Sequence, residues 1–299
     1  MIKKVLAIYY TQTGQLNEIV DNFTAPFTRS GVLVEKVIVS PKKKYPFPWT
    51  SDNFFDEMPE SVLSIPTELV PFTLREPSYD LIIFAYQPWF LSPSIPATSL
   101  LVHPAFQAVL KNTPVVTLIG ARNMWLNAQV RVKKALGNSG ANLVGNVALV
   151  DKNNNTISAV TILYWMLTGK KDRYLKVFPK PGVADADIAR SYEFGEIVLQ
   201  HLLSGDWGKL QSKLIQEKAV EVKSDLMFIE SRAKILFSIW ANLIIKKKNR
   251  RPWVFLFKYY LLIALFIVAP IVVFINKLTF QPFLRKRINQ KKQYYLALN

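Results

Sequence analysis

The chain contains no cysteine, and only two of its 299 residues are histidine. Without cysteine there is no disulfide scaffold, no thiolate metal site and no cysteine nucleophile. His103 and His201 lie far apart in the sequence, so a histidine-rich metal site is not expected either. These absences exclude several catalytic classes, and we predict no metal site.

Acidic residues are missing from the last part of the sequence. Residues 231–299 contain 14 Lys and Arg and no Asp or Glu, whereas residues 1–230 contain the other 24 basic residues and all 21 acidic ones. The excess positive charge therefore surrounds the apolar run of the C-terminal part. This arrangement is typical of a membrane surface, and no nucleic-acid recognition motif accompanies it. We expect contact with a membrane and no nucleic-acid binding.

Short apolar runs bounded by turn residues predict five buried parallel strands, at residues 5–10, 32–39, 81–85, 115–119 and 143–150. Helical patterns separate them, at Leu16–Phe23, 104–110, 126–136 and, with Asp185 as the expected N-cap, 185–203. Because the first strand begins almost at residue 1, we expect no signal peptide. The alternation predicts a doubly wound α/β sheet with helices on both faces.

Two long segments interrupt this alternation. Residues 40–78 carry seven prolines and several aromatic residues, which favours a lid or wall packed on the domain over a mobile linker. Residues 152–180 contain the apolar stretch "AVTILYWMLTG", which is too short to span a bilayer and is expected to be buried or to lie at an interface.

The loop after the first strand is the first candidate site. Backbone N–H groups and a helix N-terminus can surround an anion there, the threonine hydroxyls can donate to it, and the glycine permits close approach. The pattern is neither GxxxxGK[ST] nor GxGxxG, and the absence of a lysine suits a phosphate monoester such as that of FMN. An ordinary polar N-cap turn is the alternative. The loop consists of Thr11, Gln12, Thr13, Gly14 and Gln15.

Two further loops follow the third and fourth strands, and all three therefore meet at the carboxyl edge of the sheet, where open α/β sheets bind ligands. Aromatic side chains of the second loop can stack on a flavin ring, and Arg122 in the third can polarise the flavin N1/O2 edge or bind an anionic substrate. A structural ion pair is the alternative role for Arg122. The candidate cofactor residues of these loops are Tyr86, Gln87, Pro88, Trp89, Phe90, Gly120, Ala121, Arg122, Asn123 and Trp125.

The T-x-T-G loop is similar to the FMN phosphate loop of flavodoxin-like proteins, although Gln15 and Leu16 stand where that family often has Asn and Thr. The stretches "KKYPFPWTSDNFFDEMPES", "LIIFAYQPWFLSPSIP", "GARNMWLNAQ" and "FKYYLLIALFIVAPI" resemble the dialkylresorcinol condensing enzyme family of bacterial aryl-lipid and flexirubin-type pigment biosynthesis. The resemblance implies a flavodoxin-like fold, FMN as cofactor and a lipid-like substrate.

Carbon–carbon condensation requires a cysteine nucleophile that this chain lacks, so a separate ketosynthase-like partner is expected to form the ring. The remaining reaction is the oxidation of a dialkylcyclohexanedione to a dialkylresorcinol, with FMN accepting the hydride. Tyr86, His103 and Arg122 are the candidate catalytic residues, although capping or a surface position also explains His103. Two alternatives remain open: a membrane-bound NAD(P)H:quinone or FMN reductase, and a non-enzymatic scaffold that docks the ketosynthase.

The C-terminal third is expected to attach the protein to a membrane. Residues 225–245 are amphipathic, with Leu226, Ile229, Ala233, Leu236, Trp240 and Leu243 on one face. Residues 259–275 are uncharged and nearly long enough to cross a bilayer, and Pro270 is expected to kink that helix. Six basic residues on each side give no orientation bias, so a single span and a re-entrant anchor remain alternatives.

We therefore predict three parts: residues 1–205, a flavodoxin-like FMN domain with insertions at 40–78 and 152–180; residues 206–250, an amphipathic connector; and residues 251–299, a membrane anchor with basic flanks. The expected location is the bacterial inner membrane, with the main domain on its cytoplasmic face.

Overall fold

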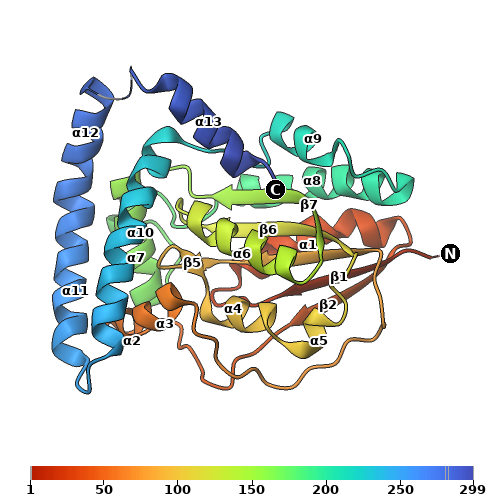
Figure 1. The fold of residues 1–299 in the computed structure, drawn as a ribbon, viewed down its shortest axis with the longest axis horizontal. Coiled ribbons are helices and arrows are strands. Elements are labelled where there is room, and N and C mark those ends of the chain that lie inside the picture. Colours follow the sequence, from red (N-terminus) through yellow and green to blue (C-terminus); the bar gives the residue numbers. More distant parts are fainter. Residues whose placement is uncertain (1, 280, 282, 299) are drawn as a thin grey trace.

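A computed structural model of the protein describes residues 2–279, 281 and 283–298. Its centre is a parallel sheet of five strands in the order β2-β1-β3-β6-β7 (Figure 1). The strand order reverses between β1 and β3, as in the flavodoxin-like class of doubly wound α/β folds, which confirms the predicted fold. The strands are β1 (Lys4–Tyr9), β2 (Leu33–Ile38), β3 (Leu81–Tyr86), β6 (Pro114–Ala121) and β7 (Asn142–Val150).

Helices cover both faces of this sheet, which is why most of its strands are apolar throughout. One face packs on α1 (Gln15–Arg29), α8 (Asp185–Ser204) and α9 (Leu210–Gln216). A Cβ at Gly195 of α8 would lie 2.0 Å from the carbonyl oxygen of Phe23, so the close contact of α8 with α1 requires glycine.

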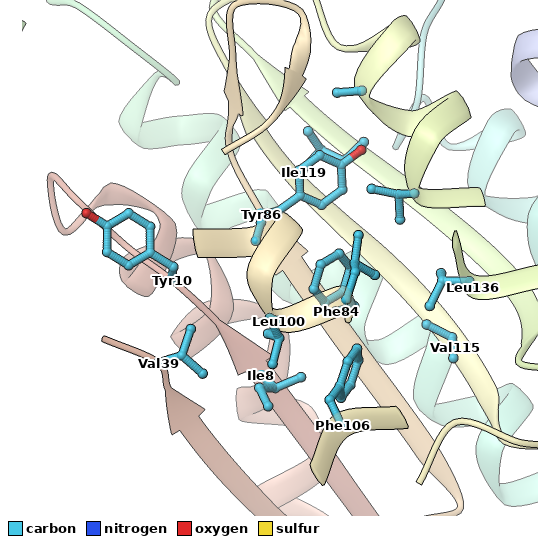
Figure 2. Close-up of a cluster of buried hydrophobic side chains, with 14 of the residues drawn as sticks. Ile8, Tyr10, Val39, Phe84, Tyr86, Leu100, Phe106, Val115, Ile119 and Leu136 are labelled. Atoms are coloured by element: carbon cyan, nitrogen blue, oxygen red, sulfur yellow. The ribbon is translucent and has the colours of Figure 1, made fainter. Parts of the chain in front are cut away.

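The other face packs on α4 (Ile95–Leu101), α5 (Pro104–Gln107) and α6 (Leu126–Asn138). Figure 2 shows this core, in which Ile8 and Phe84 of the sheet meet Leu100, Phe106 and Leu136 of the helices. The helix expected at 104–110 is the shorter α5.

The prediction that Asp185 caps α8 is wrong. The N-cap is Ala184, and Asp185 is the first helical residue, whose carboxylate pairs with Lys171 and Lys180. An acidic residue in the first turn still stabilises the helix through its dipole.

Both insertions pack on the domain, as expected. The first contains α2 (Ser51–Asp56) and α3 (Met58–Leu63), and its Tyr45 and Trp49 are buried against Trp89. Trp89 lies in β4 (Pro88–Trp89), which forms a small two-stranded sheet with β5 (Ser92–Pro93). The second insertion contains α7 (Asn155–Thr168), half-buried beside the carboxyl edge of the sheet, and the 3₁₀ turn η1 (Tyr174–Lys176).

The C-terminal part forms a helical hairpin beside the sheet and then returns to it (Figure 1). Helix α10 (Ser224–Ile245) is followed by α11 (Arg251–Ile263), the π turn η2 (Ala264–Val268) and α12 (Ala269–Thr279), and α13 (Arg285–Leu296) packs back on the domain. Arg251–Thr279 is one continuous helix, long and apolar enough to cross a membrane. Pro270 follows the π turn η2 by two residues, and its predicted kink stays a prediction.

Helix α10 is amphipathic as predicted, but its most buried stripe is not the predicted one. Met227, Glu230, Phe237, Ala241 and Ile244 are buried, in part against α3 and α6. The predicted stripe is only partly covered and lies toward α11 and a cavity.

Candidate functional site

A cavity of about 320 Å³ lies at the carboxyl edge of the sheet. Its wall combines the three loops singled out in the sequence with side chains of α2, α7, α10 and the Arg251–Thr279 helix. The predicted cofactor residues that line it are Thr11, Gln12, Thr13, Gln15, Gln87, Pro88, Trp89, Phe90, Gly120, Ala121 and Arg122. Gly14, Tyr86, Asn123 and Trp125 do not line it.

The loop after β1 presents unused donors to this cavity. The Thr11 hydroxyl is buried and has no hydrogen-bond partner in the described part of the chain. The first N–H groups of α1 have no intrahelical acceptor, as at the start of every α-helix. Gly14, the N-cap, has φ +84°, a conformation that favours glycine. The loop therefore offers hydrogen-bond donors and a positive helix end to an anion.

Gln15 has a structural role in this loop. Its Oε1 accepts from the Val183 N–H at 3.0 Å, and its Nε2 donates to the Val183 carbonyl at 3.1 Å. The neighbouring Gly182 also lines the cavity, and a Cβ there would lie 2.7 Å from Gln15 Oε1. Gln15 thus ties the start of α1 to the segment that precedes α8.

A cation that the sequence analysis missed lies beside the same loop. Lys171 Nζ is 3.8 Å from Glu18, in the first turn of α1, and 3.6 Å from Asp185. It also lies 5.8 Å from the centre of the Trp165 ring, which lines the cavity. No local pattern could have revealed it, because the fold of the second insertion brings it to α1.

The loop after β3 forms an aromatic wall. Trp89 packs edge-on against Tyr10, Tyr45 and Trp49 and is largely buried. The next two residues, Phe90 and Leu91, have φ of +44° and +64° and form the tight turn between β4 and β5. Such turns favour Asn and Gly, so two bulky residues there hold backbone strain at the cavity wall.

Phe90 connects this wall to the C-terminal helices. Its ring lies 4.7 Å from that of Phe54 in α2, and 6.4 Å from those of Phe237 in α10 and Phe257 in α11. The sequence shows that Phe54, Phe90, Phe237 and Phe257 are aromatic, but it does not show that their rings are in contact.

Arg122 is the only Lys, Arg, Asp, Glu or His among the described residues of the cavity wall. Its Nη1 donates to the backbone carbonyl of Asn155 at 3.1 Å and to Asn155 Oδ1 at 3.2 Å. Burial lowers its pKa to about 10, opposed by the charge of Asp151, so it stays protonated at neutral pH. It forms no ion pair in the described part of the chain, and the charge of Asp151 acts on it from a greater distance.

Asn123 and Trp125 are buried next to this loop. The Asn123 amide donates to Asn155 Oδ1 at 2.9 Å, the same oxygen that accepts from Arg122. Asn123 therefore positions the acceptor of Arg122 and does not itself face the cavity.

The structure places two of the three predicted catalytic residues away from the cavity. Tyr86 is fully buried in the core of Figure 2, and its hydroxyl donates to Gln129 Oε1 at 2.8 Å. Burial, with a smaller effect of Glu230, raises its pKa well above the ordinary tyrosine value. His103 is the N-cap residue of α5, where its ring stacks on Phe72. Neither side chain reaches the cavity, so neither can act there as a base.

Most of the remaining cavity wall is apolar and comes from segments outside the three loops. Helix α7 contributes Ala159, Ile162, Leu163, Trp165 and Met166, which agrees with the predicted interface role of that apolar stretch. No group of three acidic or histidine side chains that could hold a metal occurs among residues 2–279, 281 and 283–298.

Comparisons with known proteins give a structural similarity alone. No family model matches the chain, and no curated protein matches it. Among solved structures, the chain is similar to a flavoprotein in complex with FMN from Lactobacillus acidophilus NCFM. The identity is 15%, the TM-score is 0.40, and the match covers 49% of this chain and 93% of that one. By its own strand order, the chain is a doubly wound α/β protein of the flavodoxin-like class, with a cavity at the carboxyl edge of the sheet.

Proposed function

We propose that this protein binds FMN in the cavity and acts as a membrane-attached oxidoreductase on a lipid-like substrate. One observation carries the proposal. The loops after β1 and β3, which flank the point where the strand order reverses, line the same cavity. Sheets of this order bind their ligands at that point, and in flavodoxins the ligand is FMN.

The residues present suit FMN. The free Thr11 hydroxyl, Thr13 and the N-terminus of α1 would hold the phosphate, with Lys171 nearby as a positive charge. Trp89 and Phe90 on one side and the Gly120–Arg122 loop on the other would enclose the ring. Arg122 would stabilise negative charge on the flavin or on an anionic substrate.

The proposed reaction is the aromatisation of a dialkylcyclohexanedione to a dialkylresorcinol, which removes one hydride and one proton from the ring. When bound, FMN supplies the two-electron acceptor. Arg122 would bind a dione oxygen and stabilise the negative charge of the enolate that forms when the ring proton next to the hydride-donating carbon leaves. No carboxylate or imidazole lines the described cavity, so a water molecule would accept that proton.

The substrate, the partner and the location are parts of the same proposal. The resemblance to the dialkylresorcinol condensing enzyme family supports the ring chemistry, and the apolar cavity wall suits alkyl chains. A ketosynthase-like protein would supply the cyclohexanedione, since this chain has no cysteine with which to condense acyl groups. The domain is proposed to sit on the cytoplasmic face of the bacterial inner membrane.

The cofactor is tested on protein purified from membranes. We expect a yellow protein that releases FMN, not FAD, on denaturation. Thr13→Asp places a negative charge beside the phosphate and should abolish flavin retention. Thr28→Asp makes the same change at an exposed site at the far end of α1 and should retain it. A colourless wild-type protein that does not bind added FMN would contradict the proposal.

Stopped-flow measurements separate this activity from that of an NAD(P)H:quinone or FMN reductase. A cyclohexane-1,3-dione should bleach the flavin absorbance rapidly, and NADPH should not. The reverse result would favour the reductase. Product formation that persists in flavin-free Thr13→Asp protein would favour a scaffold without redox chemistry.

A further inference from the structure

The two ends of the Arg251–Thr279 helix are tied to the same folded domain. Next to its start, Arg250 Nη1 lies 2.5 Å from the Glu60 carboxylate in α3. Near its end, Lys277 Nζ lies 2.8 Å from the Asp225 carboxylate in the first turn of α10. The helix is about 44 Å long at 1.5 Å per residue. The domain therefore contacts the helix at two points near opposite ends.

Helix α13, which follows, also returns to this domain. Gln211 Nε2 in α9 donates to the Leu296 carbonyl at 2.8 Å, and the side chains of Tyr295 and Leu296 pack against the core. Figure 1 shows α13 running from the end of α12 back toward β7 and α9. The segments before and after the apolar helix therefore lie on the same body.

A helix that crosses a bilayer separates its ends by a hydrocarbon core of about 30 Å. A folded domain that contacts both ends would have to lie inside that core, together with its ion pairs. The alternative is a helix that lies along one face of the membrane with its apolar side inserted.

The exposed side of the helix suits this second arrangement. Exposed large apolar side chains run along the whole helix, and they form a broad apolar face. They are Phe255, Leu256, Tyr259, Ile263, Ile267, Val268, Ile271, Phe274, Ile275 and Leu278. Ile235 and Ile239 of α10 are exposed as well. An apolar surface of this length is typical of a membrane contact.

The charges beside this apolar face match an anionic lipid surface. Residues 231–299 contain 14 basic and no acidic residues. Exposed basic residues follow α10 at 246–248 and occupy α13 at 285–287 and 291, and Lys292 is half-buried. Basic residues beside an inserted apolar face bind the anionic headgroups of one leaflet.

The cavity extends between α10 and this helix. Ile229, Ala233 and Leu236 of α10 and Leu261 and Leu265 of the apolar helix line it, in continuity with Thr11 and Arg122. Leu236 is also 42% exposed, next to the exposed Ile235. The π turn contributes Ala264 and Leu265 to the wall. We call this part of the cavity, lined by α10 and the apolar helix, the chain channel.

We propose that the Arg251–Thr279 helix lies in the plane of one leaflet, and that alkyl chains of an amphiphilic substrate enter the cavity from that leaflet through the chain channel. This rests on the proposed function, which assigns the polar end of the cavity to the reacting ring. The channel has the chemistry for a long-chain amphiphile with a small, anionic or enolic head, because Arg122 is the charged group at the inner end.

Membrane placement is tested by introducing single cysteines and labelling them. Because the chain has no native cysteine, all labelling comes from the introduced residue. Asn249→Cys and Gln290→Cys mark the two sides of the apolar helix, and Ser30→Cys marks the domain; all three sites are exposed. Each full-length variant is labelled with a membrane-impermeant maleimide in spheroplasts and in inverted vesicles. We expect all three to label from the same side. Labelling of Gln290→Cys only from the side opposite to Ser30→Cys would overturn the proposal.

The channel is tested with cis-parinaric acid, a fluorescent 18-carbon fatty acid, on detergent-free protein in amphipol. Ala233→Trp should weaken binding of the probe at least tenfold, because the indole fills the channel. Ile239→Trp, on the exposed side of α10, should change it less than twofold. If Ala233→Trp fails to fold, Ala233→Leu supplies the same comparison.

Equal probe affinity in the Ala233 and Ile239 variants would overturn the proposal that alkyl chains bind in the chain channel. FMN content is measured on the same samples. Loss of probe binding with retained FMN in Ala233→Trp supports the channel. A wild-type protein that binds the probe but never FMN would refute the proposed function and leave the channel standing.

Discussion

Arg122 is the residue on which the proposed chemistry depends most. It is positively charged, partly buried and held by Asn155, and it forms no ion pair in the described structure, although the charge of Asp151 acts on it from a greater distance. A guanidinium in this state is a strong donor to an anion, since hydrogen bonds to charged groups are stronger than neutral ones.

Replacing Arg122 by Gln should weaken binding of an anionic ligand roughly 10- to 100-fold, equivalent to the loss of a charged hydrogen bond of about 1.5–3 kcal/mol. The measurement is a titration of the flavin absorbance with 5,5-dimethylcyclohexane-1,3-dione, which forms the same type of enolate but cannot be aromatised, above the pKa of the dione. Arg75→Gln, an exposed arginine, is the matched control and should bind normally. Unchanged affinity in Arg122→Gln would exclude a direct contact with the ligand.

At the scale of elements, α10 is joined to the sheet domain through a buried carboxylate. Glu230 Oε1 accepts from the Asn127 N–H at 2.7 Å, at the start of α6, and the Asn127 amide donates to the Glu230 carbonyl at 3.1 Å. The α6 N-cap, Trp125, provides no side-chain hydrogen bond to the first turn of α6. Glu230, from the distant helix α10, supplies the capping acceptor in its stead. Glu230 Oε2 is buried and has no partner in the described chain.

Burial raises the pKa of Glu230 to about 7, although hydrogen bonds from residues 126 and 127 oppose the shift. Because the folded-state pKa is raised, this group stabilises the fold below its unfolded pKa, and that contribution is lost as pH rises through about 7. We expect the free energy of unfolding to fall by about 3 kcal/mol between pH 4.5 and 8.

Glu230→Gln should remove most of this pH dependence and be more stable than wild type at pH 8, because its amide keeps the acceptor for Asn127 without the buried charge. Urea unfolding at pH 5, 6.5 and 8 measures the effect. Glu221→Gln, at an exposed site, should follow the wild-type curve. A wild-type stability that rises over this range would show that Glu230 is not the dominant group.

At the scale of the whole molecule, the C-terminal helices have two separable roles, one in packing and one at the proposed membrane surface. Phe257 is fully buried against Phe55 and Phe90, whereas Phe274, on the same helix, is 64% exposed. Single substitutions can therefore separate the two.

Phe257→Ala should lower the free energy of unfolding by about 3–5 kcal/mol, as for other buried aromatics, and leave vesicle binding intact. Phe274→Asp should weaken binding to vesicles of mixed neutral and anionic lipid about a hundredfold without changing the thermal midpoint. Vesicle flotation and thermal unfolding measure the two quantities. If both variants lose both properties, packing and membrane contact are one function of this helix.

Much of the fold was determined by local sequence. Five apolar runs bounded by turn residues specify the strands, because strands covered on both faces must be apolar. The loops after β1, β3 and β6 were also recognisable, since parallel strands bring their carboxyl ends to one edge of the sheet. The aromatic residues of the first insertion predicted a packed wall, because exposing aromatic surface to water is unfavourable. For the same reason, Tyr45 and Trp49 are buried in the structure.

Only the tertiary structure decided which side chains face the cavity. Tyr86 is the last residue of β3, and its side chain is buried in the core, whereas Gln87 follows the strand and lines the cavity. Lys171 beside α1 and Glu230 at α6 depend on contacts between segments distant in sequence, which local patterns do not encode. The same is true of the ion pairs of Arg250 and Lys277. Composition makes the helix between them apolar enough for a membrane, but the domain that contacts both ends determines how it can lie there.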